Sequence, residues 1–259
     1  MTRKSTAISA PNIALLKYWG KKDDLLKIAL NDSISITLDE NVLRSKTTIE
    51  ILDSFGADEI GLNGKKVNDE KINEWLMLVR KRLLKKYPVL KNKIKIESEN
   101  NFPTSTGIAS SASGFCALAT ALCACLGIEK REEMSRIARL GSGSASRSVY
   151  GGFVQWKAGT NTENSFAVQI KPKEHWDDIY DVIAVVDEGI KKVSSKDGME
   201  NTVRSSRLMH CRLAEIKKRR VRMLRAIGKR DFDSLAIEMM RDSNQMHAKC
   251  LTHGPPFFT

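Results

Sequence analysis

The sequence predicts a mixed α/β protein with two domains, the first over residues 1–178 and the second over residues 179–259. Polar and apolar residues alternate in several short segments, as in half-buried strands, while other segments repeat their apolar residues at helical spacing. A chain of 259 residues is long enough for one large domain or two smaller ones. The boundary is placed after residues 171–178, where Pro172 and a polar cluster interrupt the pattern.

Strands are predicted mainly in the first hundred residues. SISITL (residues 33–38) and KTTIEIL (46–52) alternate, and residues 59–62 continue the β character up to a turn at Asn63-Gly64. KIKIE (93–97) alternates again. Residues 166–170 and 182–186 are further candidates, the second apolar throughout and therefore suited to a buried position. These segments predict a hairpin-rich N-terminal sheet.

Helices are predicted over residues 70–86, 129–140, 199–227 and 233–246. In the first of them, Ile72, Trp75, Val79 and Leu83 fall on one face. A fifth helix follows the loop that begins at Asn100, and its stripe of Phe115, Leu118, Leu122 and Leu126 predicts a place in a core.

Composition narrows the choice of partners and compartment. The chain is 41% hydrophobic and 29% charged, as in folded globular proteins, and its net charge of +12 favours anionic partners. Its five cysteines are scattered and odd in number, which favours a reducing compartment. The start lacks the apolar stretch of a secretory signal and no apolar run is long enough to span a bilayer, so we expect a cytoplasmic protein with no membrane partner.

The transition from loop to helix at residues 100–127 is typical of an anion site. The first N–H groups of a helix lack intrahelical acceptors, and the helix dipole favours negative charge there. Ser110, Ser111 and Ser113 could add hydroxyl donors. A buried, alanine-rich helix with an ordinary start is the alternative, and the two interpretations are compatible.

A second cluster, GSGSASRS (141–148), repeats this chemistry. Its glycines allow the backbone to approach an anion, its serines supply hydroxyls, and Arg147 can bind a phosphate or carboxylate through two hydrogen bonds. Lys17 and Lys21 bracket Tyr18, Trp19 and Gly20, a combination suited to a small, multiply charged substrate. A flexible turn and a solvated surface segment are the respective alternatives.

Two other patterns predict little. KKRRVRMLR (217–225) lacks interleaved aromatic residues, so a solvated helix face is favoured over a nucleic-acid site. His247, Cys250 and His253 give three candidate ligands where a structural zinc site usually needs four, so no metal site is predicted.

Four segments together resemble mevalonate diphosphate decarboxylase, a family of the GHMP kinase superfamily. They are APNIALLKYWGK (10–21), NFPTSTGIASSAS (101–113), RLGSGSASRSVYGGFVQW (139–156) and KKVSSKDGM (191–199), with DSNQMHAKCLTHGPPFF (242–258) as a weaker fifth. The resemblance implies a GHMP kinase fold and an ATP- and Mg²⁺-dependent reaction of isoprenoid synthesis. Mevalonate 5-diphosphate is phosphorylated on its tertiary hydroxyl and then loses phosphate and CO₂ to give isopentenyl diphosphate.

The resemblance also assigns residues. Lys17, Ser111 and Arg147 match catalytic positions. The nucleotide phosphate loop is matched by Ser105, Gly107, Ser110 and Ser111. The substrate-binding positions are matched by Tyr18, Trp19, Gly20, Lys21, Ser142, Gly143, Ser144, Ala145, Ser146, Arg147, Ser195, Lys196 and Met199. Enzymes of this family are commonly homodimers, so the resemblance leaves a homodimer open.

One departure from the family pattern concerns its catalytic aspartate, which lies in a DAGPN-like segment downstream of the PPFF region. This sequence ends at Thr259, directly after that region. On this ground the chain is interpreted as C-terminally truncated, with a partial second domain and impaired activity. The alternatives are an inactive homologue that binds ATP or substrate, and an interaction protein.

Overall fold

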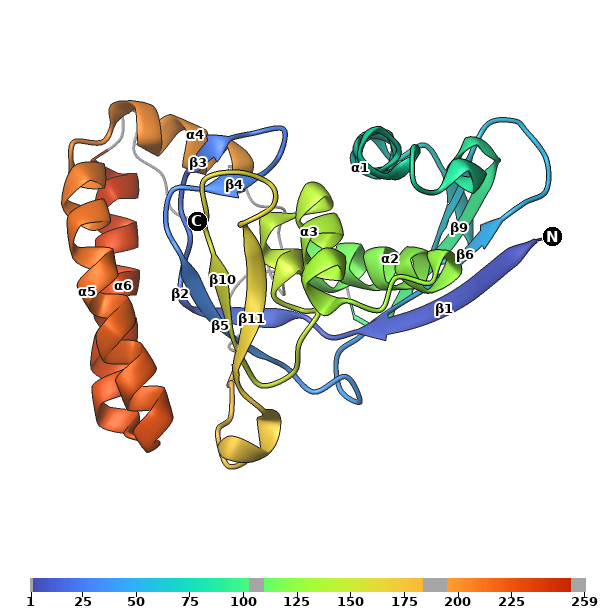
Figure 1. Ribbon diagram of the computed structural model, residues 1–259. Helices are drawn as coiled ribbons and strands as arrows, with labels where there is room; N and C mark the ends of the chain where they lie inside the picture. Colours follow the sequence, from blue (N-terminus) through green and yellow to red (C-terminus); the bar gives the residue numbers. More distant parts are fainter. Residues whose placement is uncertain (1, 103–109, 184–194, 253–259) are drawn as a thin grey trace. The chain divides into compact units, whose positions relative to one another are not determined.

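The computed structural model describes residues 2–102, 110–183 and 195–252 (Figure 1). The chain forms two compact units. Unit 1 comprises Met1–Ile13, Leu25–Lys27 and Thr37–Tyr150, and unit 2 comprises Ala14–Asp24, Ile28–Ile36 and Gly151–Thr259. The sequence-based boundary after residue 178 stays a prediction. No helix in the described ranges has the length and apolar character needed to cross a membrane.

Unit 1 contains a five-stranded sheet in the order β1-β6-β9-β7-β8. Its strands are β1 (Arg3–Ser9), β6 (Ser45–Ile51), β9 (Ile94–Asn100), β7 (Glu59–Leu62) and β8 (Lys65–Val67). β6 pairs antiparallel with β1 and β9, whereas β7 runs parallel to β9. The hairpin from β7 to β8 turns at Asn63 and Gly64, whose φ angles of 49° and 75° are both left-handed, so the predicted turn is confirmed.

Three helices complete unit 1: α1 (Glu70–Leu83), α2 (Ser110–Leu126) and α3 (Arg131–Gly141), with 3₁₀ turns η1 (Pro88–Lys91) and η2 (Gly143–Ser146). Helix α1 begins where the Asp69 side chain accepts the Ile72 N–H. Helix α2 packs against β1, β6 and α3. Because its small residues allow close approach to the sheet, most of α2 is buried. Indole Nε1 of Trp75 donates to the Ile137 carbonyl at 2.9 Å, which ties α1 to α3.

Unit 2 contains most of a four-stranded sheet in the order β11-β10-β5-β2 and a small two-stranded sheet of β3 and β4. Their bounds are β2 (Asn12–Leu16), β5 (Ser33–Thr37), β10 (Phe153–Lys157), β11 (Phe166–Lys171), β3 (Lys21–Asp23) and β4 (Ile28–Ala29), followed by the 3₁₀ turn η3 (Lys173–His175). Asn12 and Ile13 of β2 and Thr37 of β5 belong to unit 1. β10 pairs antiparallel with both β5 and β11.

The helices of unit 2 are α4 (Ser195–Ser205), α5 (Leu208–Lys229) and α6 (Phe232–Leu251). Figure 1 shows α5 and α6 as a helical hairpin, joined at Arg230, whose φ of 56° is left-handed, and at Asp231, which caps α6. Apolar residues of α5, among them Met223 and Ile227, share a core with Leu16, Ile34 and Phe153 of the sheet. The hairpin therefore covers one face of this sheet.

Two predicted elements differ from the structure. The helix expected over 199–227 is two helices, separated at Ser206 and Arg207, and the first of them begins earlier, at Ser195. The buried strand expected over 182–186 is wrong for its two described residues: Val182 and Ile183 lie outside any strand and are 89% and 44% exposed. Residues 184–186 lie outside the described part of the chain.

Candidate active site

The predicted substrate segment, residues 17–20, connects β2 to β3 in unit 2 and has no regular secondary structure. Side chains therefore hold its backbone. The Lys17 N–H donates to Asp242 Oδ2 at 3.0 Å, and the Lys17 carbonyl accepts from Arg212 Nη2 at 2.5 Å and from Asn31 Nδ2 at 3.3 Å. Sequence reasoning had not identified any of these three partners.

Trp19 is the buried anchor of this segment, with no exposed surface. Its indole Nε1 donates to Thr202 Oγ1 on α4 at 2.6 Å, and its ring packs with Met199, Met246 and Cys250. The structure therefore brings together Trp19 and Met199, two of the residues assigned to substrate binding. Tyr18 contacts Trp156 edge-on, with ring centroids 4.9 Å apart. Ser195 and Lys196 begin α4, but their side chains lie outside the described part of the structure.

Gly20 and Lys21 fix the end of the segment. Gly20 has a φ of 94°, and a Cβ there would lie 2.5 Å from Val203 Cγ2 and 2.6 Å from Leu30 Cδ1, so the position requires glycine. Lys21 Nζ lies 2.7 Å from Asp24 Oδ1, and only 8% of the Lys21 side chain is exposed. The charge of Lys21 is thus held by a carboxylate in the turn between β3 and β4.

The side-chain amines of two lysines lie near the Trp19 ring. Lys17 Nζ is 5.6 Å and Lys249 Nζ is 4.8 Å from the ring centroid, within the range of cation–π attraction. Burial of Lys249, followed by the nearby charge of Arg212, lowers the pKa of its amine from 10.5 to about 6. Within the described residues its Nζ has no hydrogen-bond partner. Sequence reasoning missed Lys249 as well.

The predicted phosphate loop belongs to unit 1, and its described part is the first turn of α2. Ser111 is exposed there, whereas Ser113 is buried and bonds Ser45 Oγ at 2.7 Å. Ser111 can therefore donate to a ligand at the helix start, while Ser113 has a structural role. Ser110 is half-buried at the first helical position. Ser105 and Gly107 lie outside the described residues.

The second predicted cluster folds as the 3₁₀ turn η2, also in unit 1. Ser142 and Ser144 are partly exposed, and their hydroxyls lie 3.0 Å apart. Gly143, Ala145 and Ser146 are buried, and Ser146 Oγ donates to the Gly143 carbonyl at 2.7 Å. The exposed hydroxyls of this turn are thus those of Ser142 and Ser144, and the Ser146 hydroxyl serves the turn itself.

Arg147 follows this turn and is 2% exposed. Its Nε and Nη2 donate to Asn12 Oδ1 at 3.2 and 2.9 Å. The Asn12 amide in turn donates to the Ser144 carbonyl at 3.0 Å and to Ser148 Oγ at 2.8 Å. Asn12 therefore fixes the orientation of Arg147 relative to the turn. The sequence signal that could have identified Asn12 is its position in the segment APNIALLKYWGK (10–21), which also contains Lys17.

The chemistry of these groups fits a polyphosphate. The exposed Ser111 hydroxyl lies at a helix N-terminus, where N–H groups and the dipole both favour anions. Among the described residues, no group of three or more His, Cys, Asp or Glu is arranged to hold a metal ion, and His253 lies outside them. Mg²⁺ is commonly held by substrate phosphates with one or two carboxylates, and such a site needs no all-protein cage.

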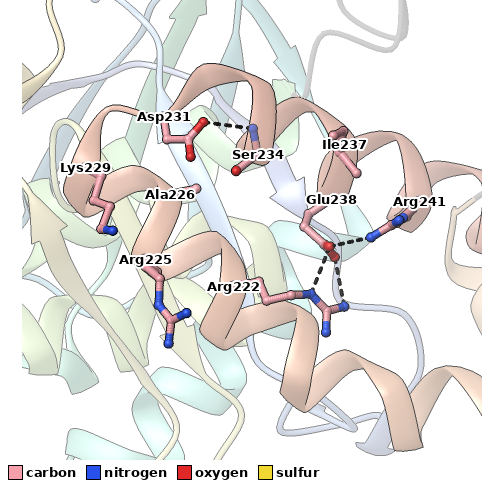
Figure 2. A pocket seen from close by; sticks show the side chains of 9 residues that line it. All are labelled: Arg222, Arg225, Ala226, Lys229, Asp231, Ser234, Ile237, Glu238 and Arg241. Atoms are coloured by element: carbon pink, nitrogen blue, oxygen red, sulfur yellow. Dashed lines mark hydrogen bonds and ion pairs between the residues drawn. The ribbon is translucent and has the colours of Figure 1, made fainter.

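A cavity of about 350 Å³ opens between α5 and α6, and none of its lining residues is a predicted site residue (Figure 2). In it the Glu238 carboxylate accepts hydrogen bonds from Arg222 and Arg241 at 2.9–3.0 Å. Burial alone would raise the pKa of Glu238, but these two guanidinium groups hold it below its usual value. The charged pair of Glu238 and Arg222 therefore joins α5 to α6.

Comparison with known proteins decides the family. Residues 9–167 match the diphosphomevalonate decarboxylase-like N-terminal domain, and residues 181–259 match the mevalonate 5-diphosphate decarboxylase C-terminal domain. The chain belongs to the diphosphomevalonate decarboxylase family. The diphosphomevalonate decarboxylase of Candida albicans is 43% identical over 98% of this chain and 74% of its own length. That of Saccharomyces cerevisiae is 41% identical over 100% of this chain and 69% of its own length.

Solved decarboxylase structures agree with this family membership. Mevalonate diphosphate decarboxylase from Staphylococcus aureus has a TM-score of 0.89 at 37% identity, covering 99% of this chain and 77% of that protein. A structure described as MDDEF in complex with MVAPP, AMPPCP and magnesium has a TM-score of 0.87 at 36% identity, covering 99% and 78%. The fold predicted from the sequence, the mixed α/β GHMP kinase fold, is confirmed by these neighbours.

Proposed function

We propose that this protein is an ATP-dependent diphosphomevalonate decarboxylase that converts mevalonate 5-diphosphate to isopentenyl diphosphate. The observation that carries the proposal is that the two decarboxylase domains match consecutive parts of one chain, residues 9–167 and 181–259. ATP and Mg²⁺ are the proposed cofactors, in keeping with the MVAPP, AMPPCP and magnesium complex of the relative. The alternatives of an inactive binder or an interaction protein are not favoured, because the relatives are named as decarboxylases.

We assign the roles of individual residues from the family positions together with their environments. Ser111 and Ser110 would hold the ATP phosphates at the start of α2, where donors and the helix dipole favour an anion. The ammonium of Lys17 would stabilise the charge on the transferred phosphoryl group, since phosphoryl transfer depends mainly on positioning and electrostatics. ATP supplies the phosphoryl group that converts the tertiary hydroxyl into a leaving group.

Substrate binding is assigned to two sets of residues. Arg147, held by Asn12, would orient the carboxylate and diphosphate end of mevalonate diphosphate, with Ser142 and Ser144 as further hydroxyl donors. Tyr18, Trp19, Gly20, Lys21 and Met199 would form the second set, to which Ser195 and Lys196 are added by sequence alone. Gly143, Ala145 and Ser146 would shape the first set through their backbone.

A turnover assay tests the function. Purified chain, residues 1–259, is incubated with Mg²⁺, ATP and mevalonate 5-diphosphate, and CO₂, ADP and isopentenyl diphosphate are measured. These three products are expected in equal amounts, together with the same amount of phosphate, and Ser111→Ala is expected to lower kcat by roughly 10²-fold, as for loss of one donor to a developing charge. No product from this chain, with the S. cerevisiae enzyme active in parallel, would refute the proposal.

A cytoplasmic location and a homodimer complete the proposal, both by analogy with the family. Fractionation of the producing cells tests the first, and light scattering of the purified chain tests the second. A mass of one chain across the accessible concentration range would exclude the dimer.

A further inference from the structure

The backbone N–H and C=O of Lys17 are both hydrogen-bonded to a buried ion pair of the α5–α6 hairpin. Asp242 on α6 accepts the N–H of Lys17, and Arg212 on α5 donates to its carbonyl. The two residues also bond each other, with Arg212 Nη1 2.7 Å from Asp242 Oδ1 and Nη2 3.3 Å from Oδ2. One closed ring of hydrogen bonds therefore includes Lys17, Asp242 and Arg212.

This ion pair is almost completely removed from water, because the Arg212 and Asp242 side chains are 0% and 4% exposed. Arg219, one heptad after Arg212 on α5, adds a second cation at 3.2 Å from Asp242 Oδ1 and also donates to Gln245 Oε1 at 2.8 Å. Desolvating three charged groups is expensive, and a buried ion pair is weak evidence for stability. Its hydrogen bonds to an irregular segment point to a role in fixing geometry.

The same face of α6 continues along the substrate segment. Met246 and Cys250, one and two turns beyond Asp242, pack against Trp19. Lys249 lies over the indole ring of Trp19, and the hydroxyl of Thr202 on α4 accepts the hydrogen bond of the indole N–H. Residues 17–19 are thus shaped by contacts with α6, together with Arg212 of α5 and Thr202 of α4.

We infer that Arg212 and Asp242 are positioning residues that hold the Lys17 backbone and so aim its ammonium group. The catalytic part of this inference rests on the proposed function of Lys17. A general tie between α5 and α6 does not account for the arrangement, because Arg222 and Glu238 already join these helices through two hydrogen bonds. Within the described part of the chain, Arg222 and Glu238 bond residues of α5 and α6 and not the segment 17–20.

Arg212→Lys tests the inference most directly. It keeps a cation beside Asp242 but loses the planar fork that reaches both Asp242 and the Lys17 carbonyl. Arg222→Lys is the matched control, because Arg222 also lies on α5 and also makes two hydrogen bonds to one carboxylate, that of Glu238 on α6. Asp242→Asn is the second variant, because its amide oxygen can still accept the Lys17 N–H while the charge on Arg212 is no longer balanced.

Two measurements are made on each protein. Hydrogen exchange reports the protection of the Lys17 amide, and steady-state kinetics separates kcat from KM. In Arg212→Lys the Lys17 N–H keeps its acceptor, but Asp242 loses the guanidinium fork that orients it. We therefore expect the Lys17 amide to exchange about tenfold faster, and kcat to fall at least about tenfold with KM for ATP within about twofold. Arg222→Lys should leave both readouts at wild-type values.

The outcomes separate this inference from the proposed function. Equal effects of Arg212→Lys and Arg222→Lys would overturn the inference, as would an unprotected Lys17 amide in the wild-type protein, which can be measured even where a variant does not fold. Wild-type protein without turnover would refute the function, and the exchange data would still decide whether Arg212 and Asp242 hold Lys17. If the Lys17 amide exchanged faster while kcat stayed unchanged, Arg212 and Asp242 would hold the Lys17 backbone without contributing to catalysis.

Discussion

Lys249 is a buried lysine whose charge is only partly compensated. The indole face of Trp19 attracts its ammonium group, but Arg212 and Lys17 repel it, and Asp242 is already bonded to Arg212 and Arg219. Because water is excluded, the neutral amine is favoured, which is why its pKa falls to about 6. At neutral pH the folded chain therefore gives up a proton that the unfolded chain keeps.

Lys249→Met should stabilise the protein, and more at low pH than at high pH. Below pH 6 the Lys249 amine is charged in both the folded and the unfolded chain, so folding carries the full cost of burying an ammonium group. Between about pH 6 and its ordinary pKa of 10.5, only the unfolded chain binds the proton, and the free energy of unfolding rises by up to ~1.4 kcal/mol per pH unit. Methionine has a similar length and no charge, so Lys249→Met removes both the cost of burying the charged amine and the rise of the free energy of unfolding with pH.

Urea unfolding at about pH 6, 7, 8 and 9 measures this effect as the difference between variant and wild type. That difference should shrink as the pH rises. Lys217→Met, which changes an exposed lysine of α5, is the control and should show no such trend. A constant difference for Lys249→Met would mean that the amine keeps its ordinary pKa in the folded protein.

At the level of single residues, the sequence singled out the candidate site segments but not the groups that hold them. Lys17 to Lys21 stood out because lysines and aromatic residues interrupt apolar sequence, and Ser142 to Arg147 stood out as a cluster of glycine, serine and arginine. Arg212 and Asp242 did not, because they lie 195 and 225 residues from Lys17 and contact it only in the folded chain. A helical signal for Arg212 and Arg219 existed: they fall on the stripe formed by Ile216, Met223 and Ile227.

Among elements, alternation and turn chemistry were reliable, while helix continuity was not. The strands predicted at residues 33–38, 46–52 and 59–62 are confirmed as β5, β6 and β7. The break between α4 and α5 was missed because no glycine or proline marks it in the sequence. Ser206 is fixed there by a tertiary contact, a 3.0 Å hydrogen bond between its hydroxyl and that of Thr252. Such a contact has no local sequence pattern.

The packing of α3 on α2 depends on a glycine at its end. A Cβ on Gly141 would lie 2.0 Å from Cδ1 of Phe115, far inside van der Waals contact. Gly141→Ala should therefore lower the free energy of unfolding by about 1–3 kcal/mol, as overpacking of a core does. Gly114→Ala is the matched control, because among the described residues no atom outside the adjoining helix backbone lies within 4 Å of its Cβ position, and alanine favours the helix by roughly 0.5–1 kcal/mol.

Urea unfolding of both glycine variants shows whether each substitution raises or lowers the free energy of unfolding. Destabilisation by Gly141→Ala together with stabilisation by Gly114→Ala confirms the close contact of Phe115. If Gly141→Ala also stabilised the protein, the Phe115 ring would have to move away from α3 without cost.

For the molecule as a whole, the net charge of +12 is not evidence of a nucleic-acid site on α5. Most arginines of the basic run are engaged within unit 2: Arg219 bonds Asp242, Arg220 bonds Asp32, and Arg222 bonds Glu238 and Glu215. Lys217 and Lys218 remain exposed at the start of the run. A run that appears continuous in sequence is thus divided by helix geometry between ion pairs and a short exposed stretch.

Replacing Lys217 and Lys218 by glutamine should consequently leave RNA affinity almost unchanged. The control pair is Lys65→Gln with Lys66→Gln, two adjacent exposed lysines of β8. Affinity for a single-stranded RNA is measured for each protein by fluorescence anisotropy over a range of salt concentrations. If binding is only the general attraction of a basic protein, both pairs should change the salt slope equally and slightly. If α5 were an RNA site, the Lys217 and Lys218 pair alone would lower the slope by about 0.7 for each lost phosphate contact, because each such contact releases condensed counterions.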